Sequence, residues 1–494
     1  MPEIDRSIPI PIYYQLVTLI KQQIAEGVLR PGDRLPTEAE LCAQYDISRN
    51  PIQRAMRELE TEGLIERSAR RGTFVRFAED AIELAIAIPD ARISVPGAHW
   101  RWPLERAAEQ WNAQHPALTL TLSFESIPHA HLFDHLTRAV AEGQGPDISV
   151  LDTVWVPEFA SRHYLYALDE LDPAWVARHQ AHFYEALLPA NSFAGRQYTI
   201  PTNADSSILW YRRDWFAQEG IAPPRTWDDL IAAGQHFHQP AVRERYGLSA
   251  YPLSFLGGRA GGETTTYQFL PLLWSAGADV FDGEMVVLHS EETCRTLCFL
   301  ASLVHEVELA PHGVIDLPWD GALRAFARGD VAMACGGTYE NALIGALAGW
   351  DRAAFYDHVG FVPVPPPLDR DPVMLIGGMT YGIYRQSAHA RTALELITLM
   401  LSPSILKPFS VQMEQNAAFR PVDEAIRADE HALVNTVASY MAQGRVRPVL
   451  PHYEQVSRQI QEMVETVLGG QMSTEDAVLR AAERIAGITD RPLA

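Results

Sequence analysis

The sequence predicts an α/β chain in two parts, a small N-terminal head and a long body. Three observations lead to this fold class. Residues 35–75 carry two short helical patterns joined by a tight polar link, followed by two short β patterns. From residue 82 onward, apolar strand-like runs alternate with helical ones, which is typical of a parallel α/β sheet. A length of 494 residues also exceeds one ordinary core, so two or three domains are expected.

The composition places the chain among soluble globular proteins, with 47% hydrophobic residues. No apolar run approaches the roughly 20 residues that span a bilayer, and residues 1–15 lack the basic-then-apolar order of a secretory signal. A cytoplasmic location is therefore expected. Four cysteines and scattered histidines fit no zinc spacing or catalytic constellation, so we expect neither a metal, nor a cofactor, nor an enzyme.

Charge is unevenly distributed. Residues 1–77 hold 11 of the 40 Lys and Arg and 11 of the 62 Asp and Glu, so the whole net charge of -22 lies in the body. An acidic body disfavours non-specific adhesion to phosphate, which leaves nucleic-acid contact to the head.

The head begins with a predicted amphipathic helix over residues 11–26. Thr37 stands three residues before Glu40, the pattern of a capping box, and predicts a second helix through Tyr45. Ser48 is the expected N-cap of a third helix, whose buried stripe is Ile52, Ala55, Met56 and Leu59. Two helices in this order form a helix-turn-helix, whose second helix enters the major groove of DNA.

The exposed face of the third helix supplies the candidate base contacts. Arginine can pair with guanine, and asparagine or glutamine with adenine. Strands over residues 64–67 and 73–77 flank a tip with Arg70 and Arg71, which would reach phosphate or the minor groove. The full set of expected DNA contacts is Thr37, Ser48, Arg49, Asn50, Pro51, Gln53, Arg54, Arg70, Arg71 and Gly72.

Residues 10–77 resemble the GntR-type winged-helix domain. The matching stretches are Leu35-Pro36-Thr37-Glu38, Ile47-Ser48-Arg49, Glu62-Gly63-Leu64-Ile65 and Arg71-Gly72-Thr73-Phe74-Val75. The resemblance implies that Arg49 and Gly72 contact operator DNA and that the protein is a homodimer. Ala39 and Pro51-Ile52-Gln53 depart from the family pattern at two usual arginine contacts, which predicts an unusual operator.

The body opens with predicted strands over residues 82–88, 118–124 and 148–151, with helices over 103–114 and 133–142 between them. In a parallel sheet, ligands lie at the carboxyl ends of the strands. Asp152, Thr153 and Trp155 follow the third strand, so they either face a crevice or form a surface loop.

Residues 82–490 resemble an extracellular solute-binding protein of the maltose-binding type. The resemblance is carried by Gly145-Pro146-Asp147-Ile148, Trp210-Tyr211, Thr226-Trp227-Asp228-Asp229-Leu230, Phe326-Ala327-Arg328-Gly329 and Gly377-Gly378, in family order. It implies two α/β lobes that close on a ligand, with crossings near residues 203–207, 374–379 and 414–420. We therefore expect a winged-helix head over 1–77, a linker over 78–81 and a two-lobed body over 82–494.

The second resemblance also implies a carbohydrate site. Asp205 takes the place of an acid that binds sugar hydroxyls, and aromatic side chains would stack on a pyranose ring. The candidate ligand contacts are Trp100, Asp152, Trp155, Asn203, Asp205, Gly337, Tyr339 and Arg420.

The leading hypothesis is a one-component transcriptional regulator whose operator binding responds to a small molecule, with a sugar or oligosaccharide as effector. Two alternatives stay open. One is a cytosolic solute carrier with a vestigial DNA head. The other is a regulator fused to an aminotransferase, which needs a Schiff-base lysine; the body has only Lys407, in an unsuitable context.

Overall fold

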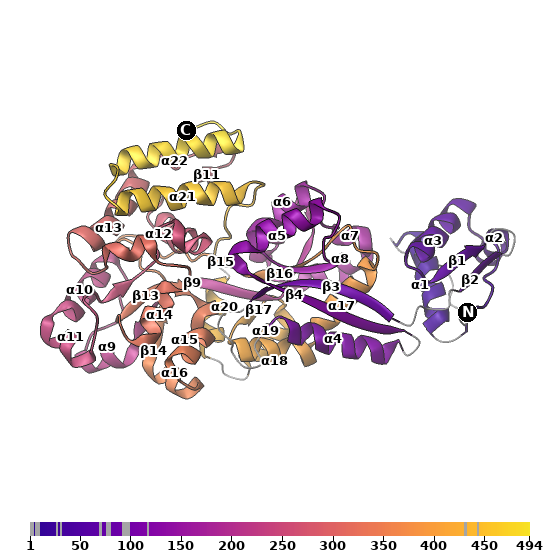
Figure 1. The fold of residues 1–494 in the computed structure, drawn as a ribbon, viewed down its shortest axis with the longest axis horizontal. Coiled ribbons are helices and arrows are strands. Elements are labelled where there is room, and N and C mark those ends of the chain that lie inside the picture. Colours follow the sequence, from indigo (N-terminus) through magenta and orange to yellow (C-terminus); the bar gives the residue numbers. More distant parts are fainter. Residues whose placement is uncertain are drawn as a thin grey trace.

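The computed structural model describes residues 4, 10–25, 28–29, 32–68, 72–75, 81–90, 99–115, 118–428, 432–441 and 444–494. It shows a head of helices with one β-ribbon, followed by a long body built on two separate sheets (Figure 1). The head lies beside the first part of the body, and the C-terminal helices lie at the opposite end (Figure 1).

The head has the order that its sequence predicts. Its elements are α1 (Ile12–Ala25), α2 (Glu38–Tyr45), α3 (Arg49–Thr61), β1 (Ile65–Ser68) and β2 (Gly72–Val75). The predicted capping box is present, because Thr37 Oγ1 accepts from the Glu40 amide and Glu40 Oε2 accepts from the Thr37 amide. Ser48 occupies the N-cap position of α3 but makes no capping hydrogen bond with its side chain. The predicted stripe of α3, from Ile52 to Leu59, is buried.

The first lobe is built on a five-stranded sheet. Its order is β4 (Thr119–Pro128), β3 (Ala81–Asp90), β5 (Ile148–Asp152), β16 (Met379–Ile383) and β8 (Thr199–Pro201). Strands β3, β4 and β5 are parallel as predicted, but β16 is antiparallel to both β5 and β8. The parallel arrangement predicted from the first three strands is confirmed, and β16 joins the same sheet in the antiparallel direction because the chain returns to it from the other lobe rather than by a crossover helix.

Helices and short hairpin strands complete this part of the chain. They are α4 (Arg101–Gln114), α5 (His129–Ala141), α6 (Val156–Ser161), α7 (Leu168–Leu171), α8 (Pro173–His179), β6 (Ser192–Phe193), β7 (Arg196–Gln197), α17 (Ala390–Met400), α18 (Pro403–Met413), α19 (Arg420–Arg427) and α20 (Ala432–Met441). Within the described ranges no single helix is long and apolar enough to cross a bilayer; the bent pair α17 and α18 passes by length and composition only, with a 66° bend between them.

The second lobe has a sheet in the order β10 (Leu253–Ser254), β13 (Met333–Gly337), β9 (Asn203–Arg212) and β14 (Val359–Val362). Its other elements are α9 (Arg213–Glu219), α10 (Trp227–His238), α11 (Pro240–Tyr246), α12 (Glu263–Ser275), β11 (Phe281–Asp282), β12 (Met285–Val286), α13 (Glu291–His305), α14 (Gly321–Arg328), α15 (Asn341–Ala348), α16 (Arg352–His358), α21 (Tyr453–Leu468) and α22 (Thr474–Thr489). The buried side chains of α12, α13, α21 and α22 share one apolar core.

Strand β9 joins the two lobes. Its first residues pair with β17 (Asn416–Ala417) and β15 (Ile376–Gly377), and its later residues pair with β13 and β14. The start of β9, β15 and β17 lie in the three stretches predicted as crossings. A fourth connection, not predicted, runs through Arg445, which pairs with Leu375 before the chain enters α21.

Candidate nucleic-acid interface and interlobe site

The first turn of α3 presents polar side chains to solvent. Ser48, Arg49 and Asn50 are exposed, and Pro51 and Gln53 are partly buried on the same helix. The opposite side of α3 packs into the head core, so this face is what the head can offer to a DNA groove.

Glu38, on α2, holds two of the predicted contacts in place. Its Oε2 accepts from Arg49 Nε and from Gln53 Nε2, both at 3.1 Å, and Oε1 lies 3.7 Å from Arg67 Nη1. The Gln53 hydrogen bond contributes most to lowering the pKa of Glu38, and Arg49 adds to it. Part of the arginine charge is thus already neutralised inside the head, and DNA must share or replace this partner.

The other predicted DNA contacts have different surroundings in the structure. The Arg54 guanidinium lies 3.9 Å from the ring centroid of Tyr13 and donates to its hydroxyl at 3.3 Å, so Arg54 packs on α1. Gly72 begins β2 with a φ of 110°, a backbone conformation that favours glycine, and Arg34 Nε would lie 2.8 Å from a Cβ at this position. Thr37 caps α2. Arg70 and Arg71 lie outside the described residues.

Between the lobes, Asp152 and Arg447 form the central ion pair. Asp152 ends β5 in the first lobe, at the carboxyl edge where a ligand was expected, and it is buried. Arg447 Nη2 donates to Asp152 Oδ1 at 2.7 Å, and Arg447 Nη1 donates to Glu263 Oε1 of the second lobe at 3.1 Å. One guanidinium therefore bridges both lobes.

Glu263 has further partners within the second lobe. The Tyr453 hydroxyl donates to its Oε1 at 2.9 Å. Burial raises the pKa of Glu263 to about 7, although the Arg447 charge opposes the shift.

Asp205, the predicted sugar-binding acid, lies on β9 beside this cluster. The Tyr267 hydroxyl donates to Asp205 Oδ1 at 3.1 Å, and burial raises the pKa of Asp205 to about 6. Tyr267 makes an edge contact with Tyr339, with ring centroids 5.8 Å apart. Gly337 leaves room for these rings, since a Cβ there would lie 2.4 Å from Tyr339 and 2.9 Å from the Tyr267 hydroxyl.

Trp155 faces the same region from the first lobe. Its Nε1 donates to Glu454 Oε1, on α21 of the second lobe, at 2.5 Å. The His129 ring stacks on Trp155 with centroids 5.3 Å apart, and burial lowers the pKa of His129. Trp155 and Glu454 are thus a second link between the lobes, beside the Arg447 bridge.

The remaining predicted ligand residues do not join this cluster. Asn203 ties the crossings together, because its Nδ2 donates to Gln415 Oε1 and its Oδ1 accepts from the Met379 amide, both at 3.0 Å. Trp100 packs against Phe409 and Tyr381 in the first lobe. Arg420 is exposed and donates to the Ala181 carbonyl oxygen. These three side chains therefore make contacts within the fold rather than with the interlobe cluster.

Several members of the cluster were not predicted, namely His129, Glu263, Tyr267, Arg447, Tyr453 and Glu454. They come from three stretches of the chain, around residue 129, over residues 263–267 and over residues 447–454, and none stands in a motif. Arg447 reaches the cluster because the chain returns to the second lobe near its C-terminal end, and no local sequence pattern indicates this return.

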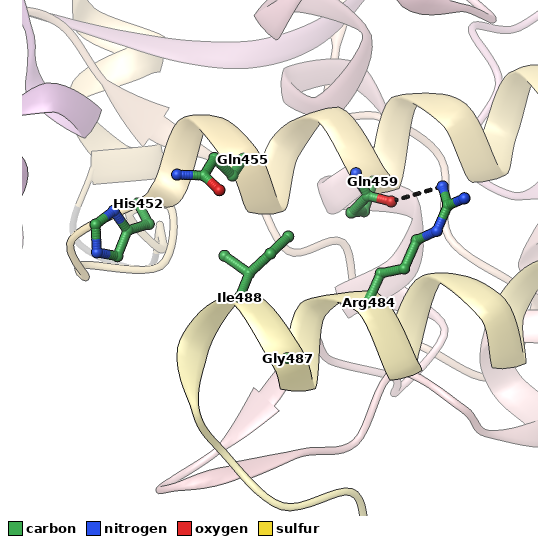
Figure 2. Close-up of a pocket in the computed structure, with 6 residues that line it drawn as sticks. All are labelled: His452, Gln455, Gln459, Arg484, Gly487 and Ile488. Carbon is green, nitrogen blue, oxygen red and sulfur yellow. Dashed lines mark hydrogen bonds between the residues drawn. The ribbon is translucent and has the colours of Figure 1, made fainter.

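A separate groove of about 500 Å³ lies between the first half of α21 and the end of α22 (Figure 2). Its lining residues are His452, Gln455, Gln459, Arg484, Gly487 and Ile488, with Arg484 donating to Gln459 (Figure 2). None of the residues predicted for a site lines it. Among the described residues, no group of three or more His, Cys, Asp or Glu could hold a metal ion.

The fold and this geometry define a two-lobed solute-binding body that carries a winged helix-turn-helix head. The chain belongs to the bacterial extracellular solute-binding protein family, whose model matches residues 103–406. Residues 12–75 match the bacterial regulatory proteins of the gntR family. Both resemblances drawn from the sequence are confirmed, and the body has the solute-binding fold rather than that of an aminotransferase.

Individual relatives cover either the head or the body. The histidine utilization repressor of Klebsiella aerogenes is 51% identical over 70 residues, 14% of this chain and 29% of the repressor. The arabinooligosaccharide-binding protein of Bacillus subtilis is 24% identical over 219 residues, 44% of this chain and 47% of that protein. The structure of an ABC transporter solute-binding protein from Thermotoga lettingae, bound with alpha-D-tagatose, has a TM-score of 0.71 at 22% identity and covers 82% of this chain and 99% of that chain.

Proposed function

We propose that this protein is a cytoplasmic transcriptional regulator whose binding to operator DNA is controlled by a carbohydrate held between its two lobes. The observation that carries the proposal is the union, in one chain, of a gntR-family head with a solute-binding body whose polar residues converge between the lobes. Neither family is described by a catalytic activity, so we propose regulation rather than catalysis.

Carbohydrate suits the chemistry of the interlobe cluster. Asp152, Asp205 and Glu263 offer carboxylate oxygens that accept hydroxyl hydrogen bonds. Tyr339 is partly exposed and adds an aromatic ring of the kind that stacks on the apolar face of a sugar, while one face of Trp155 is covered by His129. A relative named for arabinooligosaccharide binding and a similar structure bound with tagatose favour the same class of ligand.

The described contacts suggest how a ligand acts. Arg447 already joins the lobes through Asp152 and Glu263, so a ligand that takes one of these carboxylates changes the bridge and the lobe arrangement. In a dimer of this chain, a change in lobe arrangement alters the spacing of two heads and their fit to two half-sites. Such coupling is worth about 1–3 kcal/mol in regulators of this kind.

The test combines two measurements, thermal unfolding and a gel-shift assay. Thermal unfolding of the full chain is measured with arabino-oligosaccharides, maltose, tagatose and, as a control class, amino acids. Sugars that raise the melting temperature are then titrated into a gel-shift assay with DNA from upstream of the protein's own gene. We expect one sugar to stabilise the chain and to change DNA affinity by about 5- to 150-fold.

The outcomes separate the hypotheses. DNA binding without a stabilising sugar would reject the carbohydrate effector and retain the regulator. Sugar binding without DNA binding would favour the solute carrier with a vestigial head. Asp205→Asn serves as a matched variant, because it keeps the side-chain size and the Tyr267 contact but loses the charge; it should weaken sugar binding and leave the affinity for DNA unchanged.

A further inference from the structure

Arg391 of the first lobe forms ion pairs with two glutamates of the head. Arg391 lies in the first turn of α17, and its Nη2 is 2.7 Å from Glu58 Oε1 while its Nε is 3.3 Å from Glu62 Oε1. Glu58 lies in the last turns of α3, and Glu62 directly follows that helix. The Arg391 side chain is only 11% exposed, so the ion pairs are partly withdrawn from water.

Aromatic and polar contacts extend this junction. The Arg391 guanidinium lies over the ring of Tyr14 on α1, 4.9 Å from its centroid. Tyr14 is also hydrogen-bonded to Asp172 of the first lobe, and burial together with that carboxylate raises the pKa of Tyr14. Lys21 Nζ lies 3.0 Å from Glu62 Oε2, so Glu62 faces a cation from each side.

The junction is charged at its centre and incompletely filled. A cavity of about 740 Å³ separates α1 from α17 and α8. The charged side chains in its lining include Lys21, Glu62, Asp172, Arg178 and Arg391. Loosely packed interfaces of this kind within one chain are weak enough to open. The exposed first turn of α3 does not line the cavity, so Arg49 and Asn50 remain accessible while the head is docked.

The docking arginine is close in sequence to the interlobe site. Strand β16 begins at Met379, which pairs with Asp152 and donates its amide to Asn203 Oδ1. After β16 a short turn leads directly into α17 and Arg391. The helix that carries Arg391 therefore follows, after a short turn, a strand that pairs with Asp152 of the interlobe cluster.

We propose that Arg391 docks the DNA-reading head onto the first lobe through Glu58 and Glu62, and so fixes the orientation of α3 relative to the body. The head then follows the first lobe when the lobes rearrange. The movement of the head with the first lobe rests on the proposed regulatory function, whereas the docking of the head by Arg391 does not. Arg391 pairs with Glu58 and Glu62, and Glu62 also pairs with Lys21, so substitutions that reverse all four of these charges exchange the charges across the contact.

Docking is tested by the distance between head and first lobe. Spin labels are attached to p-acetylphenylalanine introduced at Ala43 on α2 and at Glu142 after α5, both of which are exposed. Pulsed dipolar spectroscopy on the full chain, without DNA or sugar, gives the distance distribution. We expect one narrow distribution in the parent chain and a broad one in Arg391→Glu. The variant Arg391→Glu/Glu58→Arg/Glu62→Arg/Lys21→Glu, which also reverses the Lys21 pair of Glu62, should restore a narrow distribution at the parent distance.

Two further variants keep the result interpretable. Arg106→Glu reverses an exposed arginine of the first lobe that pairs with Glu109 inside α4, so it should leave the distribution narrow. Arg391→Gln removes the charge with little change in volume and should broaden the distribution while the melting temperature of the body stays within a few degrees.

A broad distribution in the parent chain, or a narrow unchanged one in Arg391→Glu, would overturn the proposal. So would failure of the charge exchange to restore the parent distance while all variants remain folded. Loss of DNA or sugar binding in separate assays would instead count against the proposed function, because the distance measurement uses neither.

Discussion

Buried carboxyl groups dominate the chemistry of the interlobe region at the level of single residues. Burial raises the pKa of Asp205 to about 6, of Glu263 to about 7 and of Glu340 to about 8. Arg447 partly offsets the first two shifts. Glu340 instead accepts a hydrogen bond from Trp210 Nε1 at 2.9 Å. Each group holds its proton more tightly in the folded chain than in the unfolded one.

This shift predicts how stability depends on pH. An acid whose pKa is raised by folding binds an extra proton in the native state, so stability is highest below its unfolded pKa and falls as pH rises to the folded value. For Glu340 the window runs from about 4.5 to about 8. Glu340→Gln should therefore reduce the fall in melting temperature between pH 5 and pH 8, measured by scanning calorimetry. An unchanged pH profile would contradict a neutral buried Glu340.

At the level of elements, the head depends on how its short helices are terminated. Helix α2 has only eight residues, too few to be stable by propensity alone. The reciprocal capping of Thr37 and Glu40 satisfies two amides at its start, and Glu38 of the same turn binds Arg49 and Gln53 of α3. The start of α2 therefore stabilises the helix and positions the reading face together.

Replacing the cap tests this dual role. Thr37→Ala should destabilise α2 by about 0.5–2 kcal/mol, the usual loss for an N-cap. Hydrogen exchange followed by mass spectrometry would show faster exchange in peptides covering α2. The control is Thr61→Ala near the end of α3, whose hydroxyl donates to the Arg57 carbonyl oxygen and caps no helix start. Equal exchange in α2 of both variants would contradict the assignment.

Across the molecule as a whole, the two lobes are held together by charges as well as by crossing strands. Arg447 joins Asp152 of the first lobe to Glu263 of the second, and Trp155 reaches Glu454 across the same boundary. Closely paired buried charges contribute modestly as a set, but removing one partner leaves the others uncompensated. The arrangement of the lobes should thus be sensitive to this single guanidinium.

Arg447→Met makes that sensitivity measurable. The variant leaves two buried carboxylates without their cation, so we expect a destabilisation of about 3–5 kcal/mol and a larger radius of gyration by X-ray scattering. Adding Asp152→Asn and Glu263→Gln removes the unpaired charges and should restore much of the melting temperature. If the triple variant melts no higher than Arg447→Met, lost packing rather than unpaired charge explains the effect.

Local patterns in the sequence were sufficient to predict the architecture of this protein and which residues of α3 are buried. The capping box at Thr37, the buried stripe of α3 and the ordered family stretches of the body all depend on residues close together in the chain. Asp152 was also predictable, because a polar residue that follows an apolar strand lies at the edge of a parallel sheet.

The contacts between side chains of the interlobe cluster and of the head junction depend on packing between segments that are distant in the sequence. Arg447 and Tyr453 lie close together in the chain, but Glu263 is far from both in sequence, and no local pattern marks their convergence on one point. The same holds for Arg391, whose partners Glu58 and Glu62 lie more than 300 residues away in the chain. The direction of β16 and the packing of an α3 arginine on α1 follow from tertiary contacts as well. Contacts of this kind depend on how whole helices and strands are placed relative to one another. A sequence pattern shows only the spacing of residues within each helix or strand.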